Sequence, residues 1–196
     1  MSPMTSRPLT IELALLGYLR PGPLHGYQIH QRLLEPDGPG LVWRLKQAQL
    51  YALLGKLEEN GLLQSALQAQ ETRPTRRVFQ LTDEGRTAYD KWVSSPVRTP
   101  RQIRQEFMVK LYFANLENQQ PLMELIDNQL LVCQGWLESH TKQLDITSKR
   151  PFIWSVNSYR LGQIQATLVW LQELKAALVD GITAPGDIWM NPPLSG

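Results

Sequence analysis

The sequence predicts a mainly α-helical protein: a winged helix-turn-helix domain, with three helices and a two-stranded wing, followed by a helical dimerisation domain. Three observations predict this class. Three helix-like segments precede two strand-like runs and one more helix. Three arginines, Arg73, Arg76 and Arg77, gather where the two strand-like runs meet. The second half of the chain repeats leucine at helical spacing, which indicates long amphipathic helices.

Composition places the chain among ordinary globular proteins. Its 196 residues suit one or two domains, and 42% hydrophobic residues suffice for a core. The sequence has no uncharged apolar run long enough to span a membrane, and its start, MSPMTSRPLT, lacks the features of a signal peptide, so we expect a cytoplasmic protein with no membrane partner. The lone Cys133 favours a small core residue, and we expect no metal site and no cofactor.

Two helices are predicted before residue 35. The stretch Thr10–Leu19 is apolar enough for a mostly buried helix, with Thr10 as its cap and Glu12 near the positive helix end. Pro21-Gly22-Pro23 ends it. A second helix is predicted over His25–Leu34, before the proline- and glycine-rich EPDGPG.

The third helix is the clearest of the three. In KQAQLYALLGKLEENG, four leucines follow the spacing of a single buried stripe, and Asn60-Gly61 closes the helix. The leucines are Leu50, Leu53, Leu54 and Leu57.

The face opposite this stripe is slim, because it carries Ala48, Ala52 and Gly55. A helix that enters a DNA major groove needs such a face, with a few polar groups that reach base edges or phosphates. The polar groups available here are Gln47, Gln49, Tyr51 and Lys56. From this helix alone, an ordinary surface helix is an equally good interpretation.

A hairpin with a basic tip is predicted next. Leu62–Gln70 and RVFQL have strand patterns, ETRPT reads as the turn between them, and Thr82 caps a helix that begins with Asp83 and Glu84. In a winged helix-turn-helix the third helix enters the major groove and the wing reaches the neighbouring backbone. We therefore expect phosphate contacts from Arg73, Arg76 and Arg77. Without the three preceding helices, a solvated hairpin would be the better interpretation.

Three stretches together resemble the DNA-binding domain of the PadR family of transcriptional regulators. They are LALLGYLRPGPLHGYQIHQRL, LYALLGKLEENGLL and RPTRRVFQLTDEGR, and the resemblance covers residues 9–92 in order and with normal spacings. It implies that Tyr51 contacts the phosphate backbone and that the three arginines lie in or beside the wing. It also implies that Gly26 and Tyr27 belong to an HGY signature that packs the second helix.

The chain departs from the family pattern at two places. Gln47-Ala48-Gln49 precedes the LY pair, where Ser or Gly is common, and Ala52 follows it, where Pro is common. The wing reads RPTRR where RPRR or RPRK is commoner, so one basic position is displaced.

The second half is predicted to hold three helices after the connector VSSPVRTP: residues 101–116, 121–144 and 155–178. Such helices offer little independent core, so we expect them to join two copies of the chain. The predicted dimerisation residues are Leu161, Ile164, Leu168, Leu171, Leu174 and Leu178. EFMVKLYFANL followed by a long helix also resembles the C-terminal dimerisation region of the larger PadR subgroup.

We therefore divide the chain into a DNA-binding domain (residues 1–96), a helical dimerisation domain (97–180) and an irregular tail (181–196). The expected function is a sequence-specific transcriptional regulator, in the usual mode of look-alikes a repressor, that binds a palindromic operator as a homodimer. A winged-helix protein-interaction module that does not bind DNA is the alternative, because the net charge is only +2. The sequence carries no catalytic motif, so we do not expect an enzyme.

Aromatic residues of the second half are compatible with a small aromatic effector. They are Trp136, Trp154, Tyr159, Trp170 and Trp189. Tryptophans at helical spacing are more often core or interface anchors, so the sequence favours that interpretation over an effector site.

Overall fold

The computed structural model describes residues 10–70, 73–117, 119–147 and 150–179. It forms two compact units: the first holds the described residues up to Ser94 together with Arg104–Phe113, and the second holds Ser95–Ile103 and the described residues from Ala114 onward. The predicted boundary at residue 96 lies near the end of the first stretch, but the return of Arg104–Phe113 to the first unit was not predicted. Within the described residues, no helix combines the length and apolar character that crossing a membrane requires.

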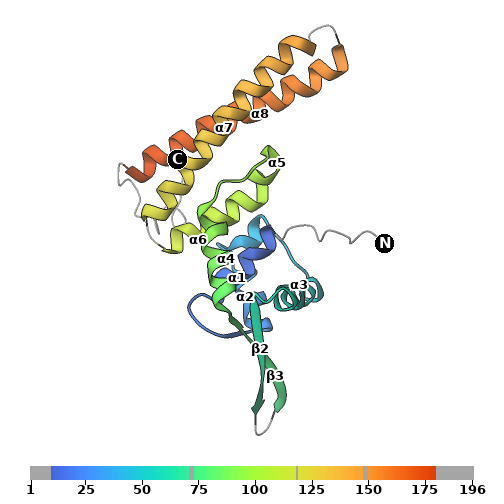
Figure 1. The fold of residues 1–196 in the computed structure, drawn as a ribbon, viewed down its shortest axis with the longest axis vertical. Coiled ribbons are helices and arrows are strands. Elements are labelled where there is room, and N and C mark those ends of the chain that lie inside the picture. The colour runs from blue at the N-terminus through green and yellow to red at the C-terminus, as the bar shows by residue number, and fades with distance from the viewer. Residues whose placement is uncertain (1–9, 71–72, 118, 148–149, 180–196) are drawn as a thin grey trace. The chain divides into compact units, whose positions relative to one another are not determined.

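The first unit packs short helices beside a small antiparallel sheet (Figure 1). Its elements up to Ser94 are, in chain order, the 3-10 helix η1 (Ile11–Leu13), α1 (Ala14–Gly17), β1 (Leu24–His25), α2 (Gly26–Leu33), the 3-10 helix η2 (Pro39–Leu41), α3 (Gln47–Glu59), β2 (Leu63–Gln70), β3 (Arg73–Leu81) and α4 (Asp83–Ser94). Three helices, a hairpin and a fourth helix follow one another as a winged helix-turn-helix requires, so the predicted fold class is confirmed.

The first helical segment is shorter than the predicted Thr10–Leu19. It opens as η1, with the N–H of Leu13 donating to the carbonyl oxygen of Thr10 at 3.0 Å, and only then becomes α1. The hydroxyl of Thr10 makes no cap hydrogen bond. Instead the Glu12 carboxylate accepts the N–H of Thr10 at 3.1 Å, so the predicted cap is wrong and Glu12 satisfies the backbone at this end.

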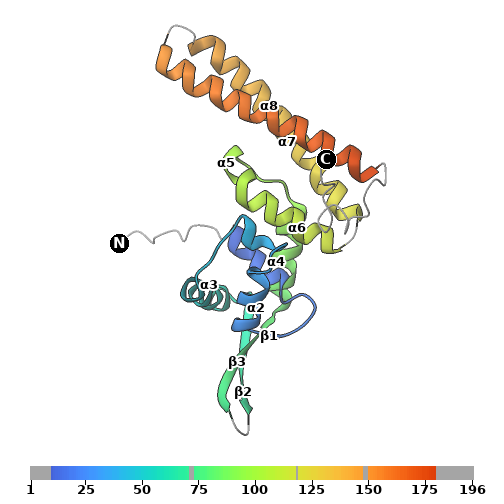
Figure 2. The ribbon, with the colours of Figure 1, turned by 180° about the vertical axis from the view of Figure 1, so that it is seen from behind.

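The sheet has the strand order β1-β3-β2, with β1 and β2 both antiparallel to β3. Leu63 pairs with Leu81 and Ser65 with Phe79, and the register shifts between Gln68 and Gln70. Figure 2 shows β2 and β3 running out together as the wing. Strand β1 has two residues, too few for an alternating pattern, and for that reason the sequence did not reveal it.

The leucine stripe predicted for α3 lies in the core of the first unit. Leu50, Leu54 and Leu57 are fully buried, and Leu53 is half-buried. The helix ends as expected at Asn60-Gly61. Gly61 has φ 73°, the left-handed conformation that favours glycine, and the N–H of Leu62 donates to the carbonyl oxygen of Leu57 at 2.9 Å.

Arg104–Phe113 joins the first unit through buried aromatic side chains. It spans most of the π-helix η3 (Ile103–Phe107) and the start of α6 (Met108–Glu117). The Phe113 ring meets the rings of Tyr18 and Tyr89 edge to face, with centroids 5.2 and 6.1 Å apart. Such contacts bury large apolar area with specific geometry, so this segment completes the core under α1 and α4.

A charged cluster is buried in the same core. Lys110 is only 2% exposed, its ammonium lies 3.8 Å from Glu106 and 5.1 Å from the centre of the Trp92 ring, and Trp92 Nε1–H donates to Glu106 at 3.0 Å. Burial lowers the pKa of Lys110 to about 8, although Glu106 opposes the shift.

The second unit consists mainly of two antiparallel helices, α7 (Gln119–Thr147) and α8 (Pro151–Val179), which lie side by side in both views (Figures 1 and 2). The side-chain N–H of Gln119 donates to the carbonyl oxygen of Leu178 at 3.0 Å, and Asp127 pairs with Lys175. The short helix α5 (Pro100–Gln102) precedes them.

The connector before α5 is held against α7 by a buried glutamine. Gln129 Oε1 accepts the N–H of Val97 at 2.8 Å, and its amide donates to the carbonyl oxygen of Val97 at 3.4 Å. Cys133 is fully buried one turn further along α7, so its predicted role as a core residue is confirmed, and burial raises the pKa of its thiol.

Candidate nucleic-acid interface

Helix α3 shows its narrow side outside the core. Ala48 and Ala52 are exposed and Gly55 is half-buried, as expected for a face that can approach another surface closely. The helix follows Lys46, whose backbone is extended at φ −72° and ψ 151°. The N–H of Lys46 donates to Oε1 of Gln49 at 3.0 Å, which satisfies a backbone group that would otherwise lack a partner at this end.

The four polar residues predicted for this helix differ in their surroundings. Gln47 is exposed, Lys56 is half-buried, and Tyr51 is 41% exposed. The Oε1 atom of Gln49 is occupied by the Lys46 cap. Gln49 therefore helps to set where α3 begins, a role that its spacing in the sequence did not indicate.

Tyr51 is seated against the first residue of α2. A Cβ atom on Gly26 would lie 2.5 Å from Cε1 and 3.0 Å from the hydroxyl oxygen of Tyr51, closer than real Cβ contacts allow. The pair borders an open hollow of about 630 Å³. Its lining residues are His25, Gly26, Tyr27, Gln28, Gln31, Tyr51 and Arg77. The HGY signature thus brings α2, α3 and the wing together around the Tyr51 ring.

His25 joins the wing to the start of α2. The backbone N–H of His25 donates to Gln28 Oε1 at 2.9 Å, and His25 pairs with Val78 between strands β1 and β3. The ring Nδ1 lies 3.3 Å from the carbonyl oxygen of Arg77, an atom that can only accept, so Nδ1 carries the proton in this contact.

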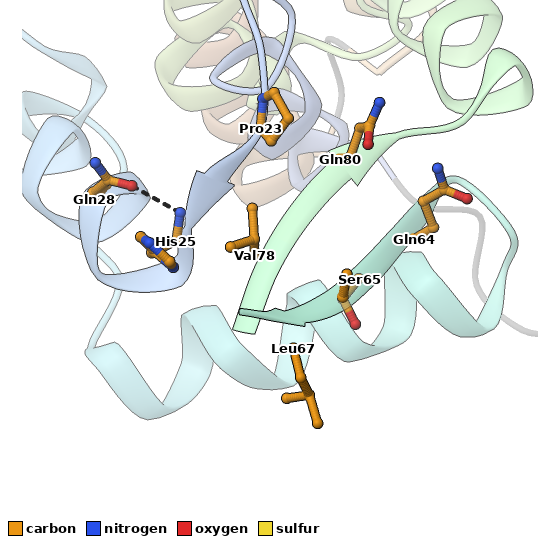
Figure 3. A pocket seen from close by; sticks show the side chains of 9 residues that line it. Pro23, His25, Gln28, Gln64, Ser65, Leu67, Val78 and Gln80 are labelled. Carbon is orange, nitrogen blue, oxygen red and sulfur yellow. Dashed lines mark hydrogen bonds between the residues drawn. The ribbon is translucent and has the colours of Figure 1, made fainter. Parts of the chain in front are cut away.

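A second hollow, of about 880 Å³, lies between this corner and the wing (Figure 3). His25 and Gln28 stand on one side, Gln64 and Gln80 on the other, and Val78 between them. The three glutamine amides each offer both donors and acceptors, so this surface can take polar groups of either kind.

Arg77 makes contacts within the chain through two of its three side-chain nitrogens. Nη2 pairs with Glu58 Oε2, and Nε–H donates to Ser65 Oγ at 2.7 Å. Ser65 Oγ–H in turn donates to Glu58 Oε1 at 2.7 Å, and the guanidinium carbon lies 5.2 Å from the centre of the Phe79 ring. The phosphate contact predicted for Arg77 remains a prediction, and the structure adds that its guanidinium already has partners.

Arg73 and Arg76 are placed by their backbones only. Arg76 pairs with Gln68 and Arg73 with Gln70 in the β2–β3 ladder, while their side chains lie outside the described part of the structure. The predicted turn ETRPT falls partly outside it as well, because residues 71 and 72 are not described.

Sequence reasoning missed His25, Glu58 and Ser65 as parts of this region. Glu58 follows Tyr51 by seven residues, so helical spacing alone places both on one edge of α3. The partnership of Ser65 with Arg77 had no comparable signal, because it depends on the register of the hairpin.

The predicted dimerisation residues lie along the contact between α7 and α8. Ile164, Leu168, Leu171 and Leu178 are at most 8% exposed within the single chain, and Leu161 and Leu174 are half-buried. That these six side chains meet a second copy remains a prediction, and their burial shows that they first hold the two helices together.

The aromatic residues predicted for an effector site differ in how exposed they are. Trp136 and Trp170 are half-buried, Trp154 is 45% and Tyr159 is 66% exposed, and Trp189 lies outside the described residues. Among the described residues, no group of three or more metal-ligating side chains comes together.

Comparison with known proteins gives a match to the family described as the transcriptional regulator PadR-like family, over residues 15–91. The chain is 32% identical over 120 residues to the "Negative transcriptional regulator PadR" of Bacillus subtilis, covering 61% of this chain and 65% of that protein. It is 26% identical over 76 residues to a "probable transcriptional regulator" of Mycobacterium tuberculosis, covering 39% of each. The chain thus spans less than two thirds of the length of these relatives.

Similar solved structures include Bacillus subtilis PadR in complex with operator DNA, at 26% identity and a TM-score of 0.43, covering 86% of this chain and 98% of that one. Bacillus subtilis PadR in complex with p-coumaric acid is similar at 24% identity and a TM-score of 0.39, covering 89% of this chain and 98% of that one. Both TM-scores are below 0.5.

Proposed function

We propose that this chain is a PadR-like transcriptional regulator, which binds double-stranded DNA through α3 and the wing, because residues 15–91 match the PadR-like family. The observation that carries the proposal is the exposed, slim face of α3 beside Tyr51. With 13 residues, α3 is about 20 Å long. Its alanine side chains add little to its width, so it fits a major groove that is about 12 Å wide.

The wing supports the same proposal through its reach and its arginines. Its strands continue the sheet to Gln70 and Arg73, as far as the described residues reach. Arginine is the side chain best suited to phosphate oxygens, because its guanidinium presents several donors in a fixed plane. We propose that the side chains of Arg73 and Arg76 and the hydroxyl of Tyr51 contact the phosphate backbone of the DNA. Such contacts position the helix on the duplex but do not read the base sequence.

The finer proposal is a repressor that acts as a homodimer on a palindromic operator. The Bacillus subtilis relative is named a negative regulator, which supports repression. A two-fold axis would place two copies of α3 about 34 Å apart, one turn of the duplex, and would match two half-sites. A small aromatic effector that releases DNA is part of the same proposal, with Trp154 and Tyr159 as the exposed aromatic groups.

Binding to a duplex from the region upstream of its own gene tests the function. Fluorescence anisotropy should show saturable binding at low salt. The logarithm of the binding constant should fall by roughly 0.9 per log unit of salt for each phosphate neutralised. Replacing Tyr51 by Ala should weaken binding by about tenfold, the loss expected for a hydrogen bond to a charged group.

A lack of binding at low salt, or binding that salt does not change, would contradict the proposal. It would favour the alternative, a winged-helix module that contacts another protein. Circular dichroism of the Tyr51→Ala variant controls for unfolding, since Tyr51 lies at the surface and its loss should leave the helical signal unchanged.

A further inference from the structure

Arg77, Glu58 and Ser65 form a closed set of contacts between the wing and α3, called the wing brace below. Glu58 lies in the last turn of α3, Ser65 on β2 and Arg77 on β3. The Glu58 carboxylate uses one oxygen for Arg77 and the other for Ser65, and Ser65 also accepts from Arg77 at 2.7 Å. Each of the three side chains therefore contacts the other two.

The wing brace is anchored to further elements through Arg77. Its guanidinium carbon lies 5.2 Å from the centre of the Phe79 ring, and Phe79 is 1% exposed. Its carbonyl oxygen accepts from His25, the residue that precedes α2. One arginine thus connects β3 to α3, to β2, to a core ring and to the start of α2.

Stability alone gives a weak reason for this arrangement. The side chains of Arg77 and Glu58 are 50% and 26% exposed, and exposed ion pairs contribute little to folding. A carboxylate on the proposed DNA-binding helix also carries the sign of charge that phosphates repel. Geometry gives a stronger reason, since the two elements that would contact DNA need a fixed angle between them if both are to contact one duplex.

We propose that Glu58 is a positioning residue for DNA binding, which holds the wing at a fixed angle to α3 through Arg77 and Ser65. The proposal rests on the proposed function. It assigns the role of Arg77 to the brace and leaves phosphate contacts to the other arginines of the wing. In the alternative arrangement, Arg77 leaves Glu58 and binds a phosphate. Glu58 then competes with DNA for the Arg77 guanidinium.

The two arrangements predict opposite effects of one substitution. Replacing Glu58 by Gln removes a negative charge, so DNA binding should tighten if Glu58 only competes for Arg77. If Glu58 positions the wing, binding should weaken by about tenfold, the size expected from losing one charge-assisted hydrogen bond. The salt slope should stay within about 1 of that of the unmodified protein, because no phosphate contact of Glu58 itself is lost.

Glu59→Gln is the matched control. Glu59 is exposed, lies next to Glu58 on the same helix and loses the same charge in the variant, but it takes no part in the brace. We expect it to bind the duplex as tightly as the unmodified protein or slightly more tightly. If Glu58→Gln binds the duplex as tightly as Glu59→Gln or more tightly, the proposal is overturned. This includes the case in which both variants bind equally weakly.

Nuclear magnetic resonance of the free protein gives a readout that does not depend on DNA. The Nε–H of Arg77, held by Ser65, should give a resolved, slowly exchanging signal that is lost in Glu58→Gln and kept in Glu59→Gln. The double variant Glu58→Arg, Arg77→Glu keeps the net charge and should restore much of the affinity that Glu58→Arg alone loses. An unrestored double variant counts against the brace.

Failure of the proposed function would look different. If the unmodified protein binds no duplex, the function fails and the positioning role fails with it, whatever the Arg77 signal shows. If the unmodified protein binds and Glu58→Gln binds equally well or better, the function stands and only the positioning role is wrong.

Discussion

Gly26 leaves room for the Tyr51 ring at the start of α2. A Cβ atom at position 26 would lie 2.5 Å from Cε1 of the Tyr51 ring, too close for an ordinary contact. Since Gly26 is also the first residue of α2, a side chain at this position would turn the Tyr51 ring away from α2. The glycine therefore matters for its lack of a side chain, and its backbone conformation is ordinary for a helix.

We predict that Gly26→Ala destabilises the protein by no more than about 1 kcal/mol, because the atoms that clash belong to the exposed end of the Tyr51 ring, which can turn aside. Gly55→Ala is the control, because its Cβ would meet nothing within 4 Å. That substitution should stabilise α3 by roughly 0.5–1 kcal/mol, since alanine loses less entropy in a helix than glycine. Urea denaturation measures both, and equal effects at the two positions would contradict the role of Gly26.

Lys110 is a buried cation whose charge depends on pH within the measurable range. Burial lowers its pKa from 10.5 to about 8, and Glu106 raises it only in part. Between those two values the unfolded chain holds a proton that the folded chain has released, so the free energy of unfolding rises with pH there. The gain over the whole window is at most about 3 kcal/mol.

The variant Lys110→Met removes this pH dependence. We predict that the unfolding free energy of the unmodified protein, minus that of the variant, rises between pH 8 and pH 10.5 and is flat between pH 6 and pH 7. Tyr18 and Tyr112, whose pKa values burial raises, are present in both proteins and cancel in the difference. A difference that is flat across the whole range would show that Lys110 keeps its proton in the folded state.

For single residues, the sequence predicted which side chains lie near the candidate interface, but it predicted less well which contacts each of them makes. Tyr51 was predicted from the LY pair and lies at the surface of α3. The neighbours of Gln49 and Arg77 were not predictable, because a cap at Lys46 and a contact with Glu58 depend on backbone direction and strand register. The contribution of the displaced arginine in RPTRR cannot be deduced from spacing for the same reason.

Among the elements, α4 depends on a single threonine at its start. Thr82 Oγ1 accepts the N–H of Gly85 at 2.9 Å and donates to the carbonyl oxygen of Gly61 at 2.7 Å. The residue that caps α4 therefore also fastens the end of α3, so the cap predicted from the sequence is confirmed and has a second partner. Asp83 and Glu84 follow in the first turn, where the helix dipole favours acidic side chains.

We predict that Thr82→Ala lowers the unfolding free energy by about 1 kcal/mol, the usual cost of losing such a cap. Thr82→Ser keeps the hydroxyl and should restore most of the loss. Thr87→Ala is the matched control, because the Thr87 hydroxyl only donates to the carbonyl oxygen of Asp83 within the same helix. A loss in Thr87→Ala as large as that in Thr82→Ala would argue against the cap.

Periodicity explains which elements the sequence could predict. The four leucines of α3 recur along one face, so the helix and its buried side follow from spacing alone. Strand β1 and the π-helix η3 have no such pattern, since one is two residues long and the other five. The return of Arg104–Phe113 to the first unit depends on the packing of Phe113, a tertiary contact that no local pattern records.

For the whole molecule, the main question is what covers the outer side of α8. The side that faces α7 holds Ile164, Leu168 and Leu171, which are buried. The opposite side carries a second stripe that alternates steps of four and three residues: Phe152, Val156, Tyr159, Gln163, Ala166, Trp170, Glu173 and Ala177. Phe152 is 80% and Tyr159 is 66% exposed. Most of this stripe is apolar, although it includes Gln163 and Glu173, and apolar residues at such spacing favour contact with another helix, so we predict that two copies of the chain meet at this outer stripe.

The last prediction tests this assignment with charge. Tyr159→Arg combined with Ala166→Arg places two cations on the outer stripe without touching the contact with α7, so a dimer should become a folded monomer by light scattering. Gln165→Arg with Gln172→Arg is the control, because both positions are exposed on the same helix, lie the same seven residues apart and stand off the stripe. Leu171→Arg should instead lower the helical signal, since Leu171 is fully buried. A stable dimer in the first variant would exclude the outer stripe, and monomers from Leu171→Arg with full helicity would return the interface to the leucines predicted from the sequence.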